Sequence, residues 1–214
     1  MNVVSPASGP FVIYTLIVSC PSTKTWWVLQ KRYSEFLVFR RALAALAKRY
    51  AGSADVAAVL TTIATTDFPK KHPFKPIHNA TKIQERTDLF KKYTTMLVAL
   101  RQACVVRALQ AENKDGLNAV HDLVVDFLSI PEALWKDDIR RTIALVSPSS
   151  SMEEETSSRP EDACAICLCE CEDSETLLKM PCQHVFHEEC VVRWLEKTPH
   201  CPLCRQSATE GHVL

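Results

Sequence analysis

The pattern of apolar residues near the start of the chain predicts a β-hairpin. Residues 11–18 read FVIYTLIV and residues 25–33 read TWWVLQKRY, and both runs are rich in β-branched and aromatic side chains. Runs of this kind, bounded by turn-forming residues, are typical of strands. The intervening residues 21–24, PSTK, suit a tight turn. We therefore expect two antiparallel strands that are joined at residues 21–24.

After the hairpin the apolar pattern changes to that of helices. Residues 34–50, SEFLVFRRALAALAKRY, show helical periodicity, and Ser34 is the expected cap. A short apolar helical stretch and a proline-rich basic loop, FPKKHPFKP, follow within residues 53–80. A long helix is expected over residues 81–109, where apolar side chains recur at helical spacing, and a further helix over residues 116–128.

The next segment predicts one more helix and then a linker. Residues 129–132, SIPE, combine a capping-box pattern with proline at the first helical position, so an amphipathic helix is expected to run to residue 146. Residues 147–162, SPSSSMEEETSSRPED, cannot bury a core, and their composition predicts disorder. We therefore expect a domain at residues 1–146, a disordered linker at 147–161 and a second domain at 162–208.

The composition of the 214 residues fits folded domains, and the charge is unevenly distributed. Apolar residues make up 47% and charged residues 23%, which excludes wholesale disorder. Residues 1–147 carry 20 basic and 12 acidic side chains, a net charge of +8, whereas residues 148–214 carry 5 and 13, a net charge of −8. The first part therefore suits an anionic surface such as phospholipid. No nucleic acid partner is expected, because no recognition helix or basic-aromatic strand face stands out.

Cysteine and histidine residues near the C-terminus form a metal-ligand pattern. They run Cys164-x2-Cys167-x14-Cys182-x1-His184-x2-His187-x2-Cys190-x10-Cys201-x2-Cys204. The N-terminal apolar run lacks the basic residues that precede it in a secretory signal, so metal binding is expected rather than disulfides. Structural zinc sites take four nitrogen or sulfur ligands. Eight ligands therefore predict two closed zinc sites, which hold together a module that is too small to fold without them.

This spacing resembles the RING finger family, in the variant with histidine at the fourth and fifth ligand positions. The resemblance covers residues 162–208 and implies two zinc ions in a cross-braced arrangement. It also implies which ligands share an ion: Cys164, Cys167, His187 and Cys190 hold one, and Cys182, His184, Cys201 and Cys204 hold the other. A catalytic Cys190–His187 dyad is an alternative, but it would leave one zinc sphere incomplete. We expect Cys169 and Cys171 to be free thiols and His200 to be a surface residue.

RING domains of this kind bind a ubiquitin-conjugating enzyme that carries ubiquitin, and they form no covalent intermediate themselves. The resemblance implies that Ile166, Trp194, Pro202 and Leu203 form the docking surface. It implies that Arg205, directly after the last ligand, hydrogen-bonds both ubiquitin and the conjugating enzyme. A substrate lysine supplies the nucleophile, so the ligase contributes positioning. For Trp194 the alternative is that its indole fills the small core of the module.

The order of elements around KRYSEF, residues 31–36, resembles the phox-homology (PX) domain. A hairpin, this motif, a helix, a basic proline-containing loop and a helix with Gln84-Glu85-Arg86 follow one another within residues 3–130. The resemblance implies binding to phosphatidylinositol 3-phosphate. Arg32 would clamp the 3-phosphate, Tyr33 would stack under the inositol ring, Lys71 would contact the 1-phosphate and Arg86 would hold ring hydroxyls. The alternatives are an ordinary solvated strand edge and a PX domain that binds protein.

Together these features predict an α+β protein that acts as a membrane-recruited RING-type ubiquitin ligase. A PX-like domain with a small antiparallel sheet and a helical bundle would dock on endosomal membranes from the cytoplasm. The flexible linker would let the RING reach substrates near that surface. The expected partners are a ubiquitin-conjugating enzyme, ubiquitin, a phosphatidylinositol 3-phosphate membrane and an unspecified protein substrate. Two alternatives remain: a non-catalytic zinc-stapled adaptor at endosomal membranes, and a ligase whose first domain recruits protein.

Overall fold

The computed structural model describes most of the chain. The described residues are 2–4, 11–70, 80–131, 140, 163–172 and 174–214. The helix expected to begin at Pro131 and to run to residue 146, the expected linker and Lys71 therefore lie outside the described residues, except for Pro131 and residue 140. None of the described helices combines the length and apolar character that a membrane span requires.

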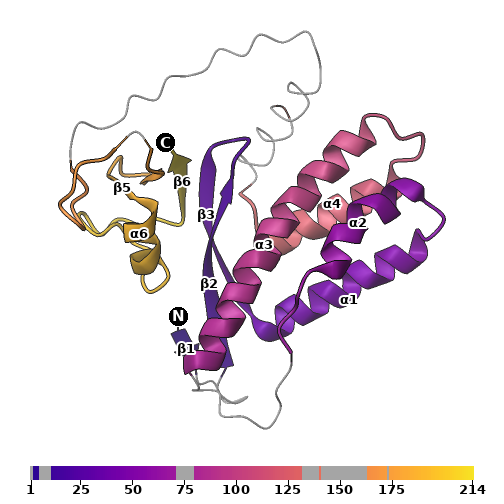
Figure 1. Cartoon of the computed structure of the whole chain (residues 1–214), viewed down its shortest axis with the longest axis horizontal. Coiled ribbons are helices and arrows are strands. Elements are labelled where there is room, and N and C mark those ends of the chain that lie inside the picture. The colour runs from indigo at the N-terminus through magenta and orange to yellow at the C-terminus, as the bar shows by residue number, and fades with distance from the viewer. Residues whose placement is uncertain (1, 5–10, 71–79, 132–139, 141–162, 173) are drawn as a thin grey trace.

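A long antiparallel hairpin lies at the centre of the molecule (Figure 1). Its strands β2 (Phe11–Cys20) and β3 (Thr25–Arg32) pair from the Cys20–Thr25 position to the Ile13–Arg32 position. The predicted strands and the turn at residues 21–24 are thus confirmed. The short strand β1 (Asn2–Val4) pairs only with the first three residues of β2.

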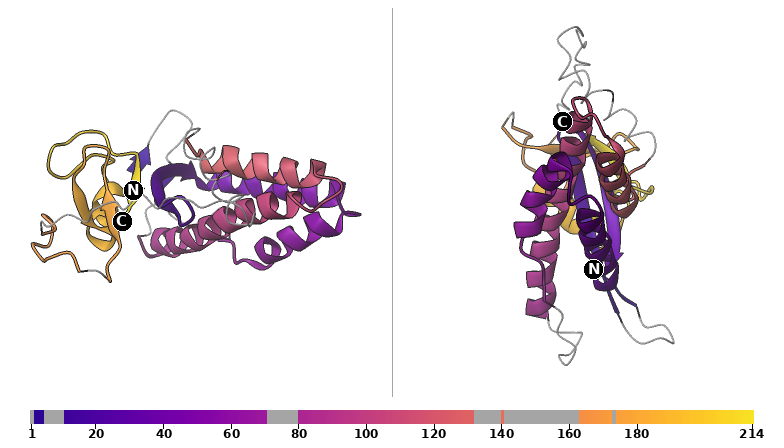
Figure 2. Two further views of the ribbon diagram at one scale, coloured as in Figure 1. Left: turned by 90° about the horizontal axis from the view of Figure 1, so that it is seen from above. Right: turned by 90° about the vertical axis from the view of Figure 1, so that its right-hand side faces the viewer.

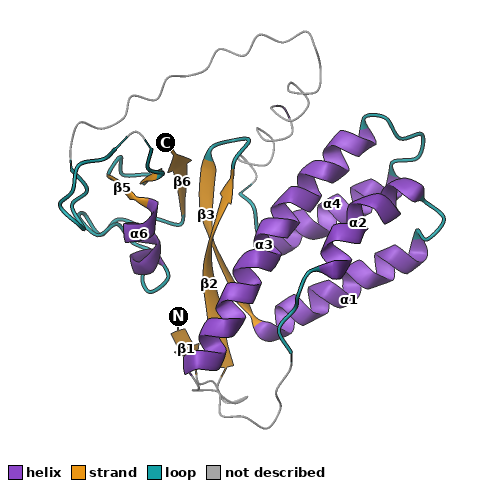
Figure 3. Ribbon diagram, viewed as in Figure 1, coloured by secondary structure: helices purple, strands orange, loops and turns teal. Residues whose placement is uncertain are grey.

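In the described part of the chain, four helices lie on one side of the hairpin (Figure 3), and the apolar spacing predicted these helices. They are α1 (Tyr33–Arg49), α2 (Ala54–Thr65), α3 (Ala80–Ala108) and α4 (Asp115–Leu128). The prediction that Ser34 caps α1 is wrong. The cap is Arg32 and the helix begins two residues earlier than a Ser34 cap would place it, because the backbone N–H of Arg32 donates to the Glu35 carboxylate (2.7 Å), which caps the first turn from inside the helix.

Alternation along the strands places one set of side chains in the core beneath these helices. Leu16 and Val18 of β2 point into this core and are buried. Phe36 of α1 and Phe90 of α3 stack there with ring centroids 3.8 Å apart. Stacked and edge-on aromatic pairs of this kind add to the free energy of burial. The hairpin and the four helices therefore form one unit with its own core.

The C-terminal module packs against the hairpin on the side away from the helices (Figures 1 and 2). It contains β4 (Leu177–Lys179), β5 (Val185–His187), α6 (Glu188–Leu195) and β6 (Glu210–Val213). Strand β6 pairs with β3 on one side and with β4 on the other, which gives a six-stranded sheet in the order β1-β2-β3-β6-β4-β5. One antiparallel sheet thus runs through both parts of the protein.

Trp26 is the central contact between the two parts. Its side chain is 0% exposed and packs in a second core with Phe186 and Val191 of the module. Its Nε1 donates to the carbonyl of Lys179 (3.3 Å). We expected a module that moves freely on a linker. The structure differs from this expectation, because the shared sheet and the buried indole hold the module against the hairpin.

Candidate metal centres and partner-binding surface

The first ligand cluster brings together Cys164, Cys167, His187 and Cys190, and these four ligand atoms lie within 4.8 Å of one another. His187 ends β5 and Cys190 lies in the first turn of α6, so their side chains share a helix face three residues apart. The Nδ1 atom of His187 is 3.3 Å from Cys167 Sγ and 3.9 Å from Cys190 Sγ. This set is the one that the RING resemblance implied for one ion.

A carboxylate that the sequence analysis missed lies beside this cluster. Glu175 Oε2 is 3.1 Å from Nε2 of His187. A carboxylate at the outer ring nitrogen orients an imidazole and leaves the other nitrogen to the metal. No local spacing marked Glu175. The antiparallel pairing of Leu177 with His187 brings it close, and this is a tertiary contact.

The second cluster brings together Cys182, His184, Cys201 and Cys204, with ligand atoms also within 4.8 Å of one another. His184 Nδ1 is 3.3 Å from Cys182 Sγ and 3.5 Å from Cys201 Sγ. Gln183, between the first two ligands, has a φ of 70°, which bends the backbone sharply there. This set matches the second one implied by the resemblance.

Both Cys-x2-Cys pairs are built on the same turn. The residue after the pair has a left-handed backbone, with φ of 62° at Leu168 and 61° at Arg205. Its N–H donates back to the first cysteine carbonyl, at 2.7 Å to Cys164 and 3.0 Å to Cys201. Non-glycine residues keep this conformation only where the surroundings determine it. The two matching turns therefore indicate that the backbone at each Cys-x2-Cys pair is shaped to bring its two cysteine side chains together.

The chemistry of the donors fits zinc. All ten cysteines are free of disulfides. Burial raises the pKa of the Cys190 thiol to about 12 and that of Cys182 to about 11. A backbone hydrogen bond from Gln206 lowers the pKa of Cys204 to about 7. Clustered thiols need a cation to stay deprotonated together, and tetrahedral sulfur and nitrogen sets of four are typical of structural zinc.

Exposed apolar side chains are concentrated on this module. Six large hydrophobic residues are exposed in the part of the chain that the structure describes, and four of them belong to the module. These four are Ile166, Leu168, Trp194 and Leu203. Leu168 was not singled out from the sequence, although it neighbours a predicted ligand. Pro202 is half-buried and Arg205 is exposed.

Trp194 lies at the surface of the module. Its side chain is 44% exposed, and its Nε1 donates to the His200 carbonyl (2.8 Å). The alternative that this indole fills the small core is therefore wrong, because Val191 and Leu195 of the same helix occupy that core. Cys169, as expected, lies outside both ligand clusters.

The structure brings two of the expected lipid-binding residues together. The guanidinium carbon of Arg86 lies 4.8 Å from the centre of the Tyr33 ring. Arg86 also donates to the carbonyl of Lys70 (3.1 Å), and the Tyr33 hydroxyl donates to the carbonyl of Pro69 (2.9 Å). The start of α3 is therefore tied to the start of α1 through the loop that precedes it.

Arg32 has other partners. Its guanidinium lies 4.7 Å from the centre of the Phe11 ring and forms an exposed ion pair with Glu35 (3.5 Å). A hollow of about 300 Å³ lies beside Arg86, and among the described residues Arg32 does not line it. Arg32 would therefore have to leave Glu35 in order to bind a phosphate there.

The C-terminal module is a RING finger domain. Residues 162–205 match the family model described as "Ring finger domain". This confirms the resemblance for that part of the chain. The matched model leaves the residues before 162 unassigned, so the PX resemblance stays a prediction.

The chain is similar to proteins that are named as ubiquitin ligases. E3 ubiquitin-protein ligase RNF181 of Rattus norvegicus is 53% identical over 49 residues, which are 23% of this chain and 30% of that protein. E3 ubiquitin-protein ligase ATL9 of Arabidopsis thaliana is 63% identical over 43 residues, 20% and 11% of the two chains. E3 ubiquitin ligase BIG BROTHER-related of Arabidopsis thaliana is 31% identical over 109 residues, 47% and 32%. The chain thus covers at most 32% of the length of these three relatives.

Proposed function

We propose that this protein is a RING-type ubiquitin ligase, which binds a ubiquitin-conjugating enzyme and promotes ubiquitin transfer to substrate lysines. The observation that carries the proposal is the concentration of exposed apolar side chains on a small module, whose buried core includes Trp26 of the hairpin. Exposed apolar patches of this kind are typical of partner-binding surfaces. The names of the relatives that share the module support the same activity.

The residues of this surface have separate roles in the proposal. Ile166, Trp194 and Leu203, with Pro202, bury apolar area against the conjugating enzyme. Arg205, exposed after the second cluster, donates hydrogen bonds to ubiquitin and to the conjugating enzyme. One zinc ion in each cluster supplies structural support and takes no part in the transfer. The gain in rate comes from holding the thioester and the attacking lysine in place.

The Ile166→Ala variant is expected to form ubiquitin chains about tenfold more slowly, because loss of an apolar anchor costs at least about 1.4 kcal/mol of binding. The measurement mixes the full chain with activating enzyme, a panel of conjugating enzymes, ubiquitin and ATP, and follows chain formation with time. Arg205→Ala should show a similar loss.

Val38→Ala is the matched control for this assay. Val38 is an exposed apolar residue on α1, outside the RING, so its truncation should leave the rate unchanged. Absence of chains with the wild-type protein and every member of the panel would contradict the ligase and favour the adaptor.

We also propose that the first domain binds phosphatidylinositol 3-phosphate and so places the protein on the cytoplasmic face of endosomal membranes. The net charge of +8 over residues 1–147 supports an anionic partner. The contact of Arg86 with Tyr33 beside a basic loop supports a headgroup site with an aromatic wall. In this proposal Arg32 leaves its ion pair with Glu35 and binds the 3-phosphate, and Lys71 contacts the 1-phosphate.

Arg86→Glu is expected to lower flotation with vesicles that contain phosphatidylinositol 3-phosphate by about tenfold, because a cation that holds the ring hydroxyls becomes an anion that the phosphates of the headgroup repel. Flotation is compared with vesicles that lack the phosphoinositide. Arg41→Glu on α1 is the matched control, since it makes the same change in net charge at an exposed residue outside the hollow. Equal flotation of the wild type and Arg86→Glu would exclude this site and favour a first domain that recruits protein.

A further inference from the structure

Along the second half of β2, one edge has no partner strand among the residues that the structure describes. Strand β1 covers this edge only opposite residues 11–13, and β3 lies on the other side of β2. No other strand in the described part of the chain pairs with β2. An open strand edge carries unpaired N–H and C=O groups, which are a template for another extended chain.

The register shows which residues face this edge. Val28 N donates to Thr209 O, so the even-numbered residues of β3 bond to β6. Because residues of an antiparallel strand bond alternately to either side, the odd-numbered residues of β3 bond to β2. Their partners on β2 are even-numbered, as in the pair of Trp27 with Val18. The backbone groups of Ile17 and Ser19 therefore point to the open edge.

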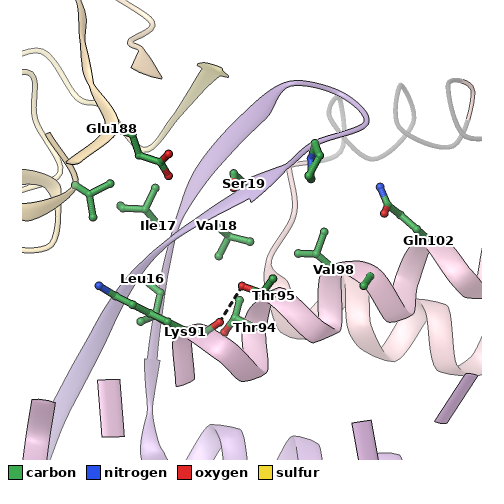
Figure 4. A pocket seen from close by; sticks show the side chains of 13 residues that line it. Leu16, Ile17, Val18, Ser19, Lys91, Thr94, Thr95, Val98, Gln102 and Glu188 are labelled. Atoms are coloured by element: carbon green, nitrogen blue, oxygen red, sulfur yellow. Dashed lines mark hydrogen bonds between the residues drawn. The ribbon is translucent and has the colours of Figure 1, made fainter. Parts of the chain in front are cut away.

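This edge lines a groove of about 400 Å³ between α3 and the RING (Figure 4). Thr95, Val98 and Ala99 form the α3 wall, and Glu188 and Val192 of α6 form the opposite wall. These three side chains of α3 are short, whereas Lys91 and Gln102, which line the groove from the same helix, are long. A strand that adds to β2 would lie about 4.8 Å from it, the spacing that neighbouring strands adopt.

A buried hydroxyl in the groove has no hydrogen-bond partner. Thr94 of α3 is 3% exposed, lines the groove, and its Oγ1 is without a partner among the described residues. Its neighbour Thr95, by contrast, donates to the Lys91 carbonyl (3.1 Å). Buried polar groups are nearly always paired. The unpaired Thr94 hydroxyl therefore points, independently of the strand edge, to a polar ligand in the groove.

We propose that this groove binds an extended segment of a protein substrate, which adds a strand to β2 and is thereby held beside the RING. The proposal rests on the ligase function proposed above and names its substrate-recruiting site. Strand addition supplies backbone partners at Ile17 and Ser19, and a backbone or side-chain group of the segment pairs with the Thr94 hydroxyl.

The shape of the groove selects a single extended chain. The edge is recessed between α3 and α6, and the edge of a second copy would be recessed in the same way, so two copies cannot pair edge to edge. Lys91 of α3 also forms an ion pair with Glu196 of the RING (2.6 Å), which joins the two walls. Val98 and Ala99 present apolar side chains to the groove, so the positions of the segment that face them should be apolar.

Ser19→Pro and Ser19→Ala test the strand addition. Proline removes the N–H at the open edge and its ring obstructs an incoming strand, while the β2–β3 ladder keeps its bonds because this N–H faces away from β3. Alanine keeps the N–H. The probe is a phage-displayed library of random peptides about 12 residues long. An extended peptide of this length, at about 3.4 Å per residue, is longer than the 10 residues of β2. It is selected on the full-length zinc-loaded protein, and the dominant peptide is then synthesised.

The synthetic peptide should bind the wild type and Ser19→Ala equally and Ser19→Pro about tenfold more weakly. It should also slow hydrogen exchange at the amides of Ile17 and Ser19. Ala99→Trp fills the groove from α3 and should also weaken binding about tenfold. This variant tests the site if Ser19→Pro does not fold.

A selection that enriches no peptide over an uncoated support would overturn the proposal. Binding that Ala99→Trp leaves unchanged, or that Ser19→Pro leaves unchanged in a folded protein, would do the same. Peptide binding is measured without a conjugating enzyme, and ubiquitin chain formation by the wild type is measured without peptide. Failure of the groove can therefore be distinguished from failure of the ligase function.

Discussion

Removal of zinc from the purified protein is expected to unfold the RING and abolish ubiquitin chain formation, while the hairpin and its helices stay folded. Among the described residues, the core of the hairpin and helices has 26 buried residues, whereas the RING core has 9, two of which are ligand cysteines and one of which is Trp26. Structural zinc contributes roughly 10–16 kcal/mol to folding of small modules at neutral pH. The RING core cannot replace a contribution of that size.

This expectation is checked by elemental analysis and by thermal melts followed by circular dichroism, before and after chelation. Two zinc ions per chain are expected. Cys164→Ser should lose zinc and the RING transition, whereas Cys169→Ser is the matched control, since Cys169 is an exposed thiol outside both clusters. Fewer than two zinc ions in the wild type, or a melt that chelation does not change, would contradict the metal assignment.

Gly211→Val is expected to detach the RING from the hairpin. A Cβ at this position would collide with the carbonyl oxygen of Lys179 and lie 2.7 Å from Nε1 of Trp26. Overpacking of such a site costs about 1–3 kcal/mol, and displacement of β6 would also expose the Trp26 indole. The variant should therefore lose the bonds that join β6 to β3.

Hydrogen exchange and small-angle scattering measure this detachment. Exchange at the amides of Val28 and Val213, which donate to Thr209 and Lys24, should speed up in Gly211→Val, and the radius of gyration should increase. Gly52→Val is the matched control, because nothing lies within 4 Å of a Cβ built there. Unchanged exchange at Val28 in Gly211→Val would show that β6 does not hold the RING.

The fixed position of the RING changes the proposed mechanism of substrate selection. A freely tethered RING would reach lysines anywhere within the length of its linker. A RING held through β6 and Trp26 presents the surface around Ile166 and Trp194 in one orientation relative to the first domain. Lysines that are held near the groove beside β2 would then be favoured over other lysines on the same substrate.

Local elements were predictable because their signals are local. The hairpin strands follow from β-rich runs on either side of PSTK, and the helices predicted at 81–109 and 116–128 end within one residue of α3 and α4. The predicted start of α1 was wrong. Both Ser34 and Glu35 can accept a hydrogen bond from a backbone N–H at a helix start, and only the structure shows that Glu35 does so.

The sequence by itself determined the eight metal ligands, the hairpin and the helical periodicity, because each depends on residues a few positions apart or on a strict ligand spacing. The division of the ligands into two sets was implied by the RING resemblance. Only the tertiary structure decided that residues 210–213, EGHV, form a strand beside β3, since this polar and glycine-containing segment carries no strand pattern of its own. It also decided that Trp26 packs in the core of the RING, that Glu175 lies beside His187 and that Arg32 pairs with Glu35. These contacts depend on which surfaces meet when distant segments pack, and such long-range pairings leave no period along the chain.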